Sequence, residues 1–176
     1  ITLHKNLEKL KKQKIDNVII EASSHGLEQK RLDRLKFKAG IFTNFSQDHL
    51  DYHKSMKAYL NAKLILFKKI IPKNNFVISD KNIKEFNFLK SISKKKSLKL
   101  LDINDIKNKI DKKSNYRFNK FQLKNIAMAV QAARLCNLSE RSIFNKLDEI
   151  KDIDGRLELV KTFPNNIRVF VDFAHT

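Results

Sequence analysis

The sequence predicts an α/β fold in which a mostly parallel sheet is flanked by helices, with additional strands near the C-terminal end. Short apolar runs of three or four residues alternate with longer helical patterns, as in strand–helix–strand units. The runs are continuously apolar, which is typical of parallel strands buried on both faces. The 176 residues suffice for one domain with a sizeable core.

Each element is expected from its own local pattern. Apolar residues at helical spacing predict helices over residues 3–13, 55–70, 122–135 and 141–150, the last capped by Ser139. Apolar runs predict strands over residues 18–20, 39–42, 76–78, 98–101, 157–163 and 167–173. Polar turns or loops are expected at 21–26 and 46–53, and a proline-containing turn at 164–166 joins the last two strands.

Composition limits the classes of partner and compartment. The chain has 37 basic and 19 acidic residues, a formal net charge of +18, which is common in proteins that bind phosphates or nucleic acid. Its lysines are dispersed, however, and the tightest cluster, at 94–96, has no interleaved aromatics, so the charge is interpreted as solubilising. One cysteine, Cys136, excludes an internal disulfide and favours a reducing compartment. We therefore expect a cytoplasmic protein with no nucleic-acid or membrane partner.

Both ends of the chain indicate a piece of a larger protein. Ile1 directly precedes a helical pattern, and Thr176 directly follows an apolar strand. No glycine-rich phosphate-binding loop is present, and only three glycines occur in the chain. Such loops need successive backbone amides in conformations that glycine permits.

Lys63 is the most unusual residue of the pattern, because it is a lone cation within an apolar helical stripe. The stripe comprises Met56, Tyr59, Leu60, Leu66 and Phe67. An ammonium group facing a core is unfavourable unless it is paired, neutralised or chemically altered. The alternative is a side chain that extends its charge to the surface.

Two polar loops follow the first two predicted strands, where parallel sheets bind ligands. The first loop presents Glu21, Ser23, Ser24 and His25; the second presents Asn44, Asp48, His49, Asp51 and His53. These side chains are competent to bind metals and phosphates. The carboxylates also fit local roles as loop acceptors or helix caps, and the spacing of His49 and His53 is only a weak zinc signal.

Several motifs together resemble the Mur ligases, and more narrowly their MurE type. The motifs are Glu21-Ala22-Ser23-Ser24-His25-Gly26-Leu27 with Gln29 and Arg31, Ile41-Phe42-Thr43-Asn44, Asp48-His49-Leu50-Asp51-Tyr52-His53, Tyr59 with Ala62-Lys63, Gly155-Arg156-Leu157-Glu158, and Val171-Asp172-Phe173-Ala174-His175-Thr176. They occur in order along nearly the whole chain.

The resemblance implies an ATP-dependent ligase that adds an amino acid to a UDP-N-acetylmuramoyl-dipeptide in peptidoglycan synthesis, through an acyl phosphate and with Mg²⁺. It implies that Glu21, His49 and Lys63 bind the metal, with Lys63 carbamylated and with Lys63 and His49 catalytic. It assigns Ser23, Gln29 and Arg31 to the muramoyl-peptide substrate. It assigns Asn125, Arg156 and Asp172 to ATP.

The resemblance also implies a domain organisation. Residues 1–176 would form the middle, ATP-binding domain, cut at both ends, with the phosphate loop and the amino-acid-binding domain outside it. The isolated piece is then expected to be inactive and monomeric. Which amino acid is added, meso-diaminopimelate or lysine, is left open. A folylpolyglutamate- or cyanophycin-type ligase and a basic nucleic-acid-binding domain remain as alternatives.

Overall fold

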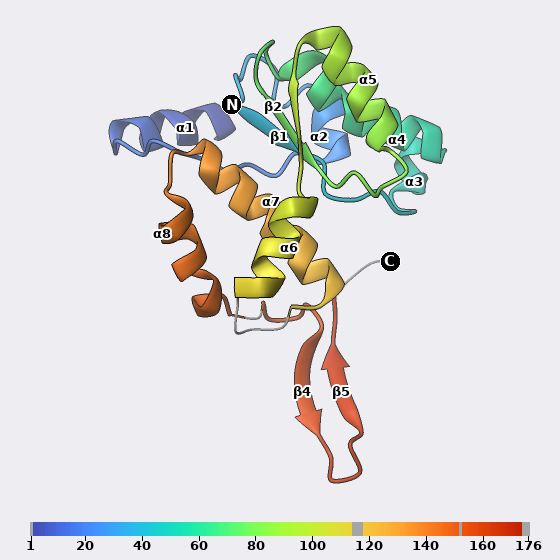
Figure 1. Ribbon diagram of the computed structural model, residues 1–176. Coiled ribbons are helices and arrows are strands. Elements are labelled where there is room, and N and C mark those ends of the chain that lie inside the picture. Colours follow the sequence, from blue (N-terminus) through green and yellow to red (C-terminus); the bar gives the residue numbers. More distant parts are fainter. Residues whose placement is uncertain (1, 114–117, 152, 174–176) are drawn as a thin grey trace.

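The computed structural model describes residues 2–113, 118–151 and 153–173 (Figure 1). Its α-helices are α1 (Thr2–Lys12), α2 (Ser24–Glu28), α3 (Leu50–His53), α4 (Met56–Ile65), α5 (Phe86–Lys96), α6 (Asn104–Lys113), α7 (Lys120–Leu135) and α8 (Glu140–Asn145). A π-helix, η1 (Leu66–Ile70), continues α4, and a 3₁₀ turn, η2 (Leu147–Glu149), follows α8. The strands are β1 (Ala39–Ile41), β2 (Phe76–Ser79), β3 (Lys99–Asp102), β4 (Glu158–Thr162) and β5 (Arg168–Val171).

The main sheet is parallel, as the sequence predicts, and has the order β1-β2-β3. Gly40 of β1 is paired with Val77 of β2, and Val77 is paired with Leu100 of β3. The α/β class is therefore confirmed. The two C-terminal strands form a separate antiparallel pair, β4-β5, as expected from the turn between them.

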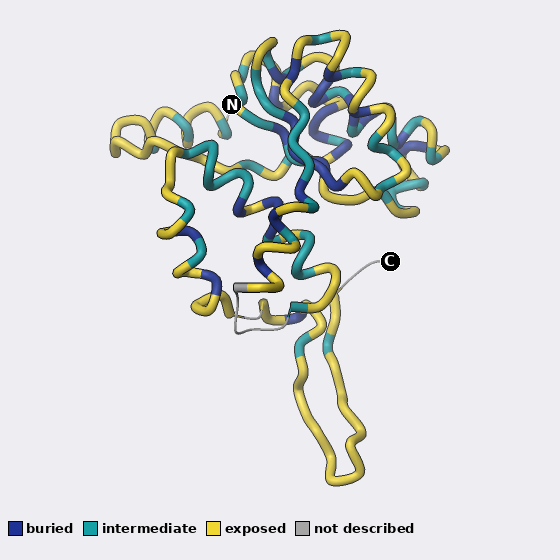
Figure 2. The backbone as a smooth tube through the Cα atoms, viewed as in Figure 1, coloured by how far each residue is buried: buried dark blue, intermediate teal, exposed yellow. Residues whose placement is uncertain are grey.

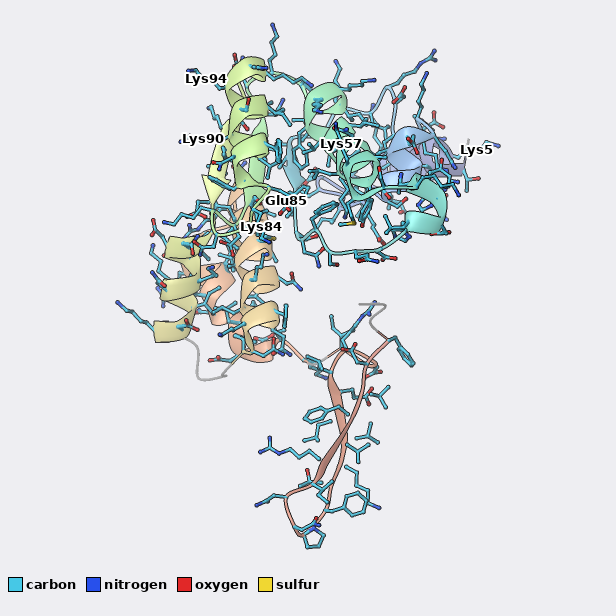
Figure 3. The ribbon with its side chains drawn as sticks, turned by 90° about the vertical axis from the view of Figure 1, so that its right-hand side faces the viewer. Lys5, Lys57, Lys84, Glu85, Lys90 and Lys94 are labelled. Carbon is cyan, nitrogen blue, oxygen red and sulfur yellow. The ribbon has the colours of Figure 1, made fainter. Side chains whose placement is uncertain are left out.

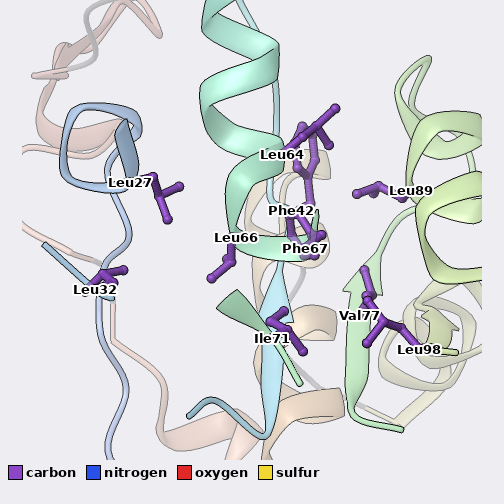
Figure 4. Close-up of a cluster of buried hydrophobic side chains, with 10 residues drawn as sticks. All are labelled: Leu27, Leu32, Phe42, Leu64, Leu66, Phe67, Ile71, Val77, Leu89 and Leu98. Carbon is purple, nitrogen blue, oxygen red and sulfur yellow. The ribbon is translucent and has the colours of Figure 1, made fainter. Parts of the chain in front are cut away.

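Helices cover both faces of the main sheet. Successive side chains of a strand point to opposite faces, and Val77 and Ile78 of β2 accordingly belong to different hydrophobic clusters. The Val77 cluster includes Phe67 of η1 and Leu89 of α5 (Figure 4). The Ile78 cluster is built largely from α6 and α7. Figure 2 shows these buried segments concentrated around the sheet.

The prediction of a strand at residues 18–20 is wrong. This segment has no strand assignment, and the side chains of Val18 and Ile19 are 44% and 90% exposed. Only Ile20 packs against the core, and it is partly buried. Within the described residues β1 pairs with β2 alone, so its other edge is free, yet residues 18–20 do not pair with it. An apolar run becomes a strand only where its backbone pairs with a neighbouring strand.

Other differences concern helices. Helix α2 begins within the polar turn predicted at 21–26 and extends past it to Glu28, and the predicted loop at 46–53 contains α3. The helix predicted over 55–70 is confirmed, but its last turn is the π-helix η1. Helices α5 and α6 were not predicted, because their apolar positions are diluted by lysines. Ser139 caps α8 as expected, accepting a hydrogen bond from the backbone N–H of Ser142 at 3.1 Å.

The hairpin β4-β5 stands away from the rest of the molecule (Figure 1). Its apolar side chains remain exposed, as Val160 (56%) and Phe170 (50%) illustrate. At its base the two arms are joined by a hydrogen bond from the backbone N–H of Phe173 to the carbonyl of Gly155 at 2.8 Å. In the described part of the chain, no helix is long and apolar enough to cross a lipid bilayer.

Gly40 should tolerate no larger residue. A Cβ atom there would lie 2.4 Å from Cδ1 of Ile71 and 2.9 Å from Cε1 of Phe67, and both side chains are almost fully buried. We expect Gly40→Ala to lower the free energy of unfolding by about 1–3 kcal/mol through overpacking, as measured by urea denaturation. Ser91→Ala, at an exposed helix position, is the control and should change it by less than about 0.5 kcal/mol. Equal stability of the two variants would contradict this packing.

Candidate active site

Lys63 lies in the last turn of α4, half-buried, with its ammonium group over an aromatic ring. Its Nζ atom is 5.1 Å from the centre of the Tyr59 ring, a cation–π geometry. Tyr59 is itself 5% exposed and forms part of the wall of the site. Lys63 is therefore held against the protein at its Nζ end, as the apolar stripe in the sequence indicates.

Two carboxylates act on this amine. Burial lowers the pKa of Lys63 below its ordinary value of 10.5, while the negative charges of Asp48 and Glu21 raise it in part. Desolvation is the largest of these effects, so the amine of Lys63 loses its proton at a lower pH than the amine of an exposed lysine. Glu21 and Asp48 come from the segments before α2 and α3, and the fold thus brings both polar loops to one lysine.

His49 is positioned by its backbone and by Asp48. It has a left-handed conformation (φ 54°) at the start of α3, and its backbone N–H donates to Oδ1 of Asp48 at 2.7 Å. Its Nε2 atom is 3.5 Å from Oδ2 of Asp48. The His49 ring also lies 5.7 Å from the Tyr59 ring, edge to face. Because Lys63 and His49 both flank Tyr59, these two predicted site residues lie in the same part of the molecule.

A buried hydrogen bond connects α2 to the segment before α4. Nε2 of His53 and Oγ of Ser24 are 2.9 Å apart, and both residues are buried. The other ring nitrogen, Nδ1, is 3.6 Å from Oε2 of Glu28, which is close for a charge but too long for a hydrogen bond. Burial lowers the pKa of His53 below 6.5, against the opposing effect of Glu28. The His53 ring is stacked on Tyr59 with centroids 5.2 Å apart, so His53 links α2 to the Lys63 site.

The residues predicted to bind the muramoyl peptide flank α2, with Ser23 at its N-cap, Gln29 at its C-cap and Arg31 just after it. Ser23 caps α2 by accepting a hydrogen bond from the backbone N–H of Gly26 at 3.1 Å. The backbone N–H of Arg31 donates to the carbonyl of Gly26 at 2.8 Å. A Cβ on Gly26 would lie 3.1 Å from Oγ of Ser23 and 3.7 Å from Cδ of Arg31. The small Gly26 thus lets Ser23 and Arg31 approach each other, and exposed Gln29 ends the helix beside them.

The residues predicted to bind ATP lie in another region. Asn125 is exposed in the second turn of α7, and exposed Arg156 and Asp172 lie at the base of the hairpin. Figures 1 and 3 place the start of α7 and the hairpin base at the same end of the molecule, away from α2–α4. The described structure therefore separates the nine predicted site residues into two groups. Gln122, near Asn125, accepts a hydrogen bond from the backbone N–H of Asn119 and completes a capping box.

Within the part of the chain that the structure describes, the side chains around Lys63 do not form a complete metal site by themselves. In residues 2–113, 118–151 and 153–173, no three His, Cys, Asp or Glu side chains lie close enough to hold a metal by themselves. The zinc interpretation of His49 and His53 gains no support, because the His53 ring is engaged by Ser24. Glu21 and Asp48 supply hard oxygen donors around Lys63, which suit Mg²⁺. Together with oxygen atoms carried by a modified Lys63, the carboxylates of Glu21 and Asp48 would fit a Mg²⁺ ion.

Several residues of the site were not predicted as site residues from the sequence. The sequence is compatible with Asp48 as a helix cap, but in the structure its carboxylate acts on Lys63 and His49. Its position directly before the predicted ligand His49 is the sequence feature that points to a role in the site. No sequence signal pairs Ser24 with His53, which are 29 residues apart. Tyr59 has the pattern of an ordinary core residue in the helical stripe, and only the structure shows Lys63 over its ring.

Comparison with known proteins places the chain in a family. The family model described as the Mur ligase middle domain matches residues 1–141. The chain is 35% identical to the UDP-N-acetylmuramoyl-L-alanyl-D-glutamate–2,6-diaminopimelate ligase of Rickettsia bellii, over the whole chain and 41% of that protein. It is 31% identical to the ligase of the same name from Bacteroides thetaiotaomicron, over the whole chain and 39% of that protein. The chain thus spans about two fifths of these relatives.

Solved structures show the same fold. A UDP-N-acetylmuramoyl-L-alanyl-D-glutamate–2,6-diaminopimelate ligase superposes with a TM-score of 0.63 at 19% identity, covering 81% of this chain and 34% of that one. MurF from Acinetobacter baumannii superposes with a TM-score of 0.56 at 13% identity, covering 72% of this chain and 32% of that one.

The environment of Lys63 predicts how its amine titrates. In NMR of lysine-labelled protein, assigned with Lys63→Arg, the pKa of Lys63 should lie below 10.5 because its ammonium is desolvated. Asp48→Asn removes a charge that raises this pKa and should lower it further. Asp51→Asn, which removes a carboxylate of the same loop, is the matched control and should leave it unchanged. Equal shifts in the two variants would contradict the assigned role of Asp48.

The lowered pKa of Lys63 makes the free energy of unfolding depend on pH. Folding favours the neutral amine, so the unfolded chain binds more protons between the folded pKa and 10.5. The contribution of Lys63 to stability should therefore increase as the pH rises through that window.

Proposed function

The chain belongs to the Mur ligase family, as its middle domain, and on that basis we propose that it is the ATP-binding part of a ligase that adds the third amino acid to UDP-N-acetylmuramoyl-L-alanyl-D-glutamate. The relatives named above are ligases for 2,6-diaminopimelate, which makes this diamino acid the proposed co-substrate. Lysine is the alternative. The proposal places the protein in the cytoplasm as a monomer, and its activity requires the parts of such a ligase that this chain does not span.

The observation that carries the proposal is the half-buried amine of Lys63 over the Tyr59 ring, on which the charges of Asp48 and Glu21 act. A neutral amine is the form that reacts with carbon dioxide. Its nitrogen attacks the carbon, a C–N bond forms, one C=O electron pair moves to oxygen, and the N–H proton leaves to solvent. The product is a carbamate anion. With the carboxylates of Glu21 and Asp48, the carbamate would make three negative charges near one another. Such a group of like charges is unfavourable unless a cation binds there.

Such a cluster of oxygens suits Mg²⁺, with Glu21, His49 and carbamylated Lys63 as the proposed ligands. Bound Mg²⁺ would screen the phosphate charges of ATP and polarise the transferred phosphoryl group. His49 is a softer donor than Mg²⁺ usually takes, but its backbone and its contact with Asp48 fix it next to Tyr59. We also propose Asp48 as a ligand, because its negative charge acts on Lys63.

In the proposed reaction a carboxylate oxygen of the muramoyl dipeptide attacks the γ-phosphorus of ATP, and ADP leaves. The amine nitrogen of the incoming amino acid then attacks the acyl carbon of the acyl phosphate. An amide bond forms, phosphate leaves, and the amine loses a proton. Two anions must meet in the first step, so the cationic groups near the site are needed to bring them together.

Arg31, Ser23 and Gln29 are the proposed contacts to the muramoyl peptide. Arg31 suits the anionic groups of this substrate because guanidinium forms paired, charge-assisted hydrogen bonds. Its backbone is fixed by Gly26 at the end of α2. Asn125, Arg156 and Asp172 are the proposed contacts to the adenine, phosphates and ribose of ATP. Their grouping at one end of the molecule is compatible with one elongated nucleotide.

Lys63→Ala should abolish ligation in the full-length ligase that contains this chain. We expect kcat for ADP formation in the presence of muramoyl dipeptide and amino acid to fall by about 100-fold or more, and added bicarbonate should not restore it. Lys69→Ala, an exposed lysine in η1, is the control and should retain activity. In parallel, ¹³C-bicarbonate should give a carbamate resonance in the 176-residue chain that Lys63→Arg removes. Full activity of Lys63→Ala would show that no carbamate is required.

Arg31→Ala should act mainly on substrate binding. Losing a charge-assisted hydrogen-bonded pair is expected to raise KM for the muramoyl dipeptide about 10- to 100-fold, with a smaller effect on kcat. Steady-state kinetics of the full-length ligase measure this, with exposed Lys36→Ala as the charge-matched control. An unchanged KM would remove Arg31 from the substrate site.

A further inference from the structure

A groove runs between α4–η1 and α5, on a face of α4 other than the one that carries Lys63. Its volume is about 720 Å³. The floor is apolar and consists of Leu60 and Leu64 from α4 and Phe88 and Ile92 from α5. Leu64 is buried and continuous with the core, whereas Phe88 is 55% exposed. An exposed phenylalanine in the lining of a groove leaves apolar surface available to a partner.

The rim of the groove is cationic. Lys57 and Lys68 line it from α4–η1, and Lys95 and Lys96 line it from α5. Its remaining polar lining residues are Asn61 and Ser91, and no Asp or Glu is among the residues that line it. Figure 3 faces this side of the molecule, with Lys57 on α4 and Lys90 and Lys94 on α5. The groove therefore combines an apolar floor with uncompensated positive charge.

Lys96 gives an independent indication of an anionic occupant. Its Nζ atom is buried and has no hydrogen-bond partner within the described structure. Burial also lowers the pKa of Lys96. A buried cation without a partner is unfavourable, and an anionic group placed in the groove would relieve this.

We propose that the groove between α4 and α5 docks an acidic amphipathic helix of a partner protein. Apolar residues at i, i+4 spacing line the groove from two helices, Leu60 and Leu64 from α4 and Phe88 and Ile92 from α5. Such a groove is of the type that accepts the apolar face of a third helix. The lysine rim selects acidic residues on the flanks of that helix. A second copy of this chain is a poor occupant, because each copy has a formal net charge of +18. Polynucleotide is disfavoured by the apolar floor with only one aromatic ring, since single strands bind to stacking platforms.

The test uses the 176-residue chain and a synthetic peptide probe. The probe is a helical peptide with leucines along one face and glutamates on the others; a peptide of the same composition, shuffled to remove the apolar face, is its control. Fluorescence anisotropy should show saturable binding of the probe that weakens with salt. The shuffled peptide should bind at least about tenfold more weakly.

Variants locate the binding to the groove. Lys68→Glu with Lys95→Glu should weaken binding about tenfold or more, whereas Lys90→Glu with Lys94→Glu makes the same charge change on residues outside the groove and should have a much smaller effect. Phe88→Ala should weaken binding, with Phe121→Ala, exposed on α7, as its control. Lys96→Met should raise the melting temperature of the free chain and yet weaken binding, since it removes the unpaired cation.

Three outcomes would overturn the proposal. They are no saturable binding of the probe, equal losses in the groove and control charge variants, and tighter binding to single-stranded polynucleotide or anionic vesicles than to the probe. Circular dichroism of each variant establishes that it is folded. None of these measurements depends on ligase activity, so they can contradict the docking proposal without contradicting the proposed function.

Discussion

The burial of β2 on both faces is the constraint on which the rest of the structure depends. Val77 and Ile78 are both 0% exposed and lie in different hydrophobic clusters, so this strand joins the two halves of the core. β2 is also the central strand between β1 and β3. Because β1 is held in register beside it, the loop that follows β1 carries His49 to the Tyr59 ring that Lys63 also contacts. The site is thus a consequence of how one short strand is packed.

Much of the fold could be predicted from the sequence, because the patterns involved are local. The strands at β1 and β2 and the helices α4 and α7 have continuous or periodic apolar residues, and the C-terminal hairpin has a proline-containing turn. The apolar run at 18–20 has the same local pattern, but the structure gives it no strand partner among the described residues. Pairing is a property of the neighbouring segment, and a single run of residues holds no information about it.

The candidate site shows the same division between local and long-range information. The unusual position of Lys63 is visible in the helical stripe, and the polar loops are visible at the predicted strand ends. The bond between Ser24 and His53 depends on the packing of α2 against the start of α4, which no spacing reveals. Likewise, the separation of Asn125, Arg156 and Asp172 from the Lys63 site follows from the course of α7, which begins beside the hairpin base and away from α2–α4 (Figure 1). Residue types indicate chemistry, whereas the fold decides which groups share a site.

The exposed hairpin β4-β5 has a practical consequence. Adjacent residues of β5, such as Val169 and Phe170, are apolar and face opposite sides of the ribbon. β4 adds the exposed Leu159 and Val160 at a register shift between Leu159 and Lys161, so the ribbon presents apolar side chains that are not suited to water. A two-stranded ribbon is marginally stable alone, and its outer edges have unpaired N–H and C=O groups. Concentrated solutions of this polypeptide should therefore self-associate through the ribbon and form β-rich precipitates. Charged substitutions at these solvent-facing positions are the direct route to samples suited to crystallisation.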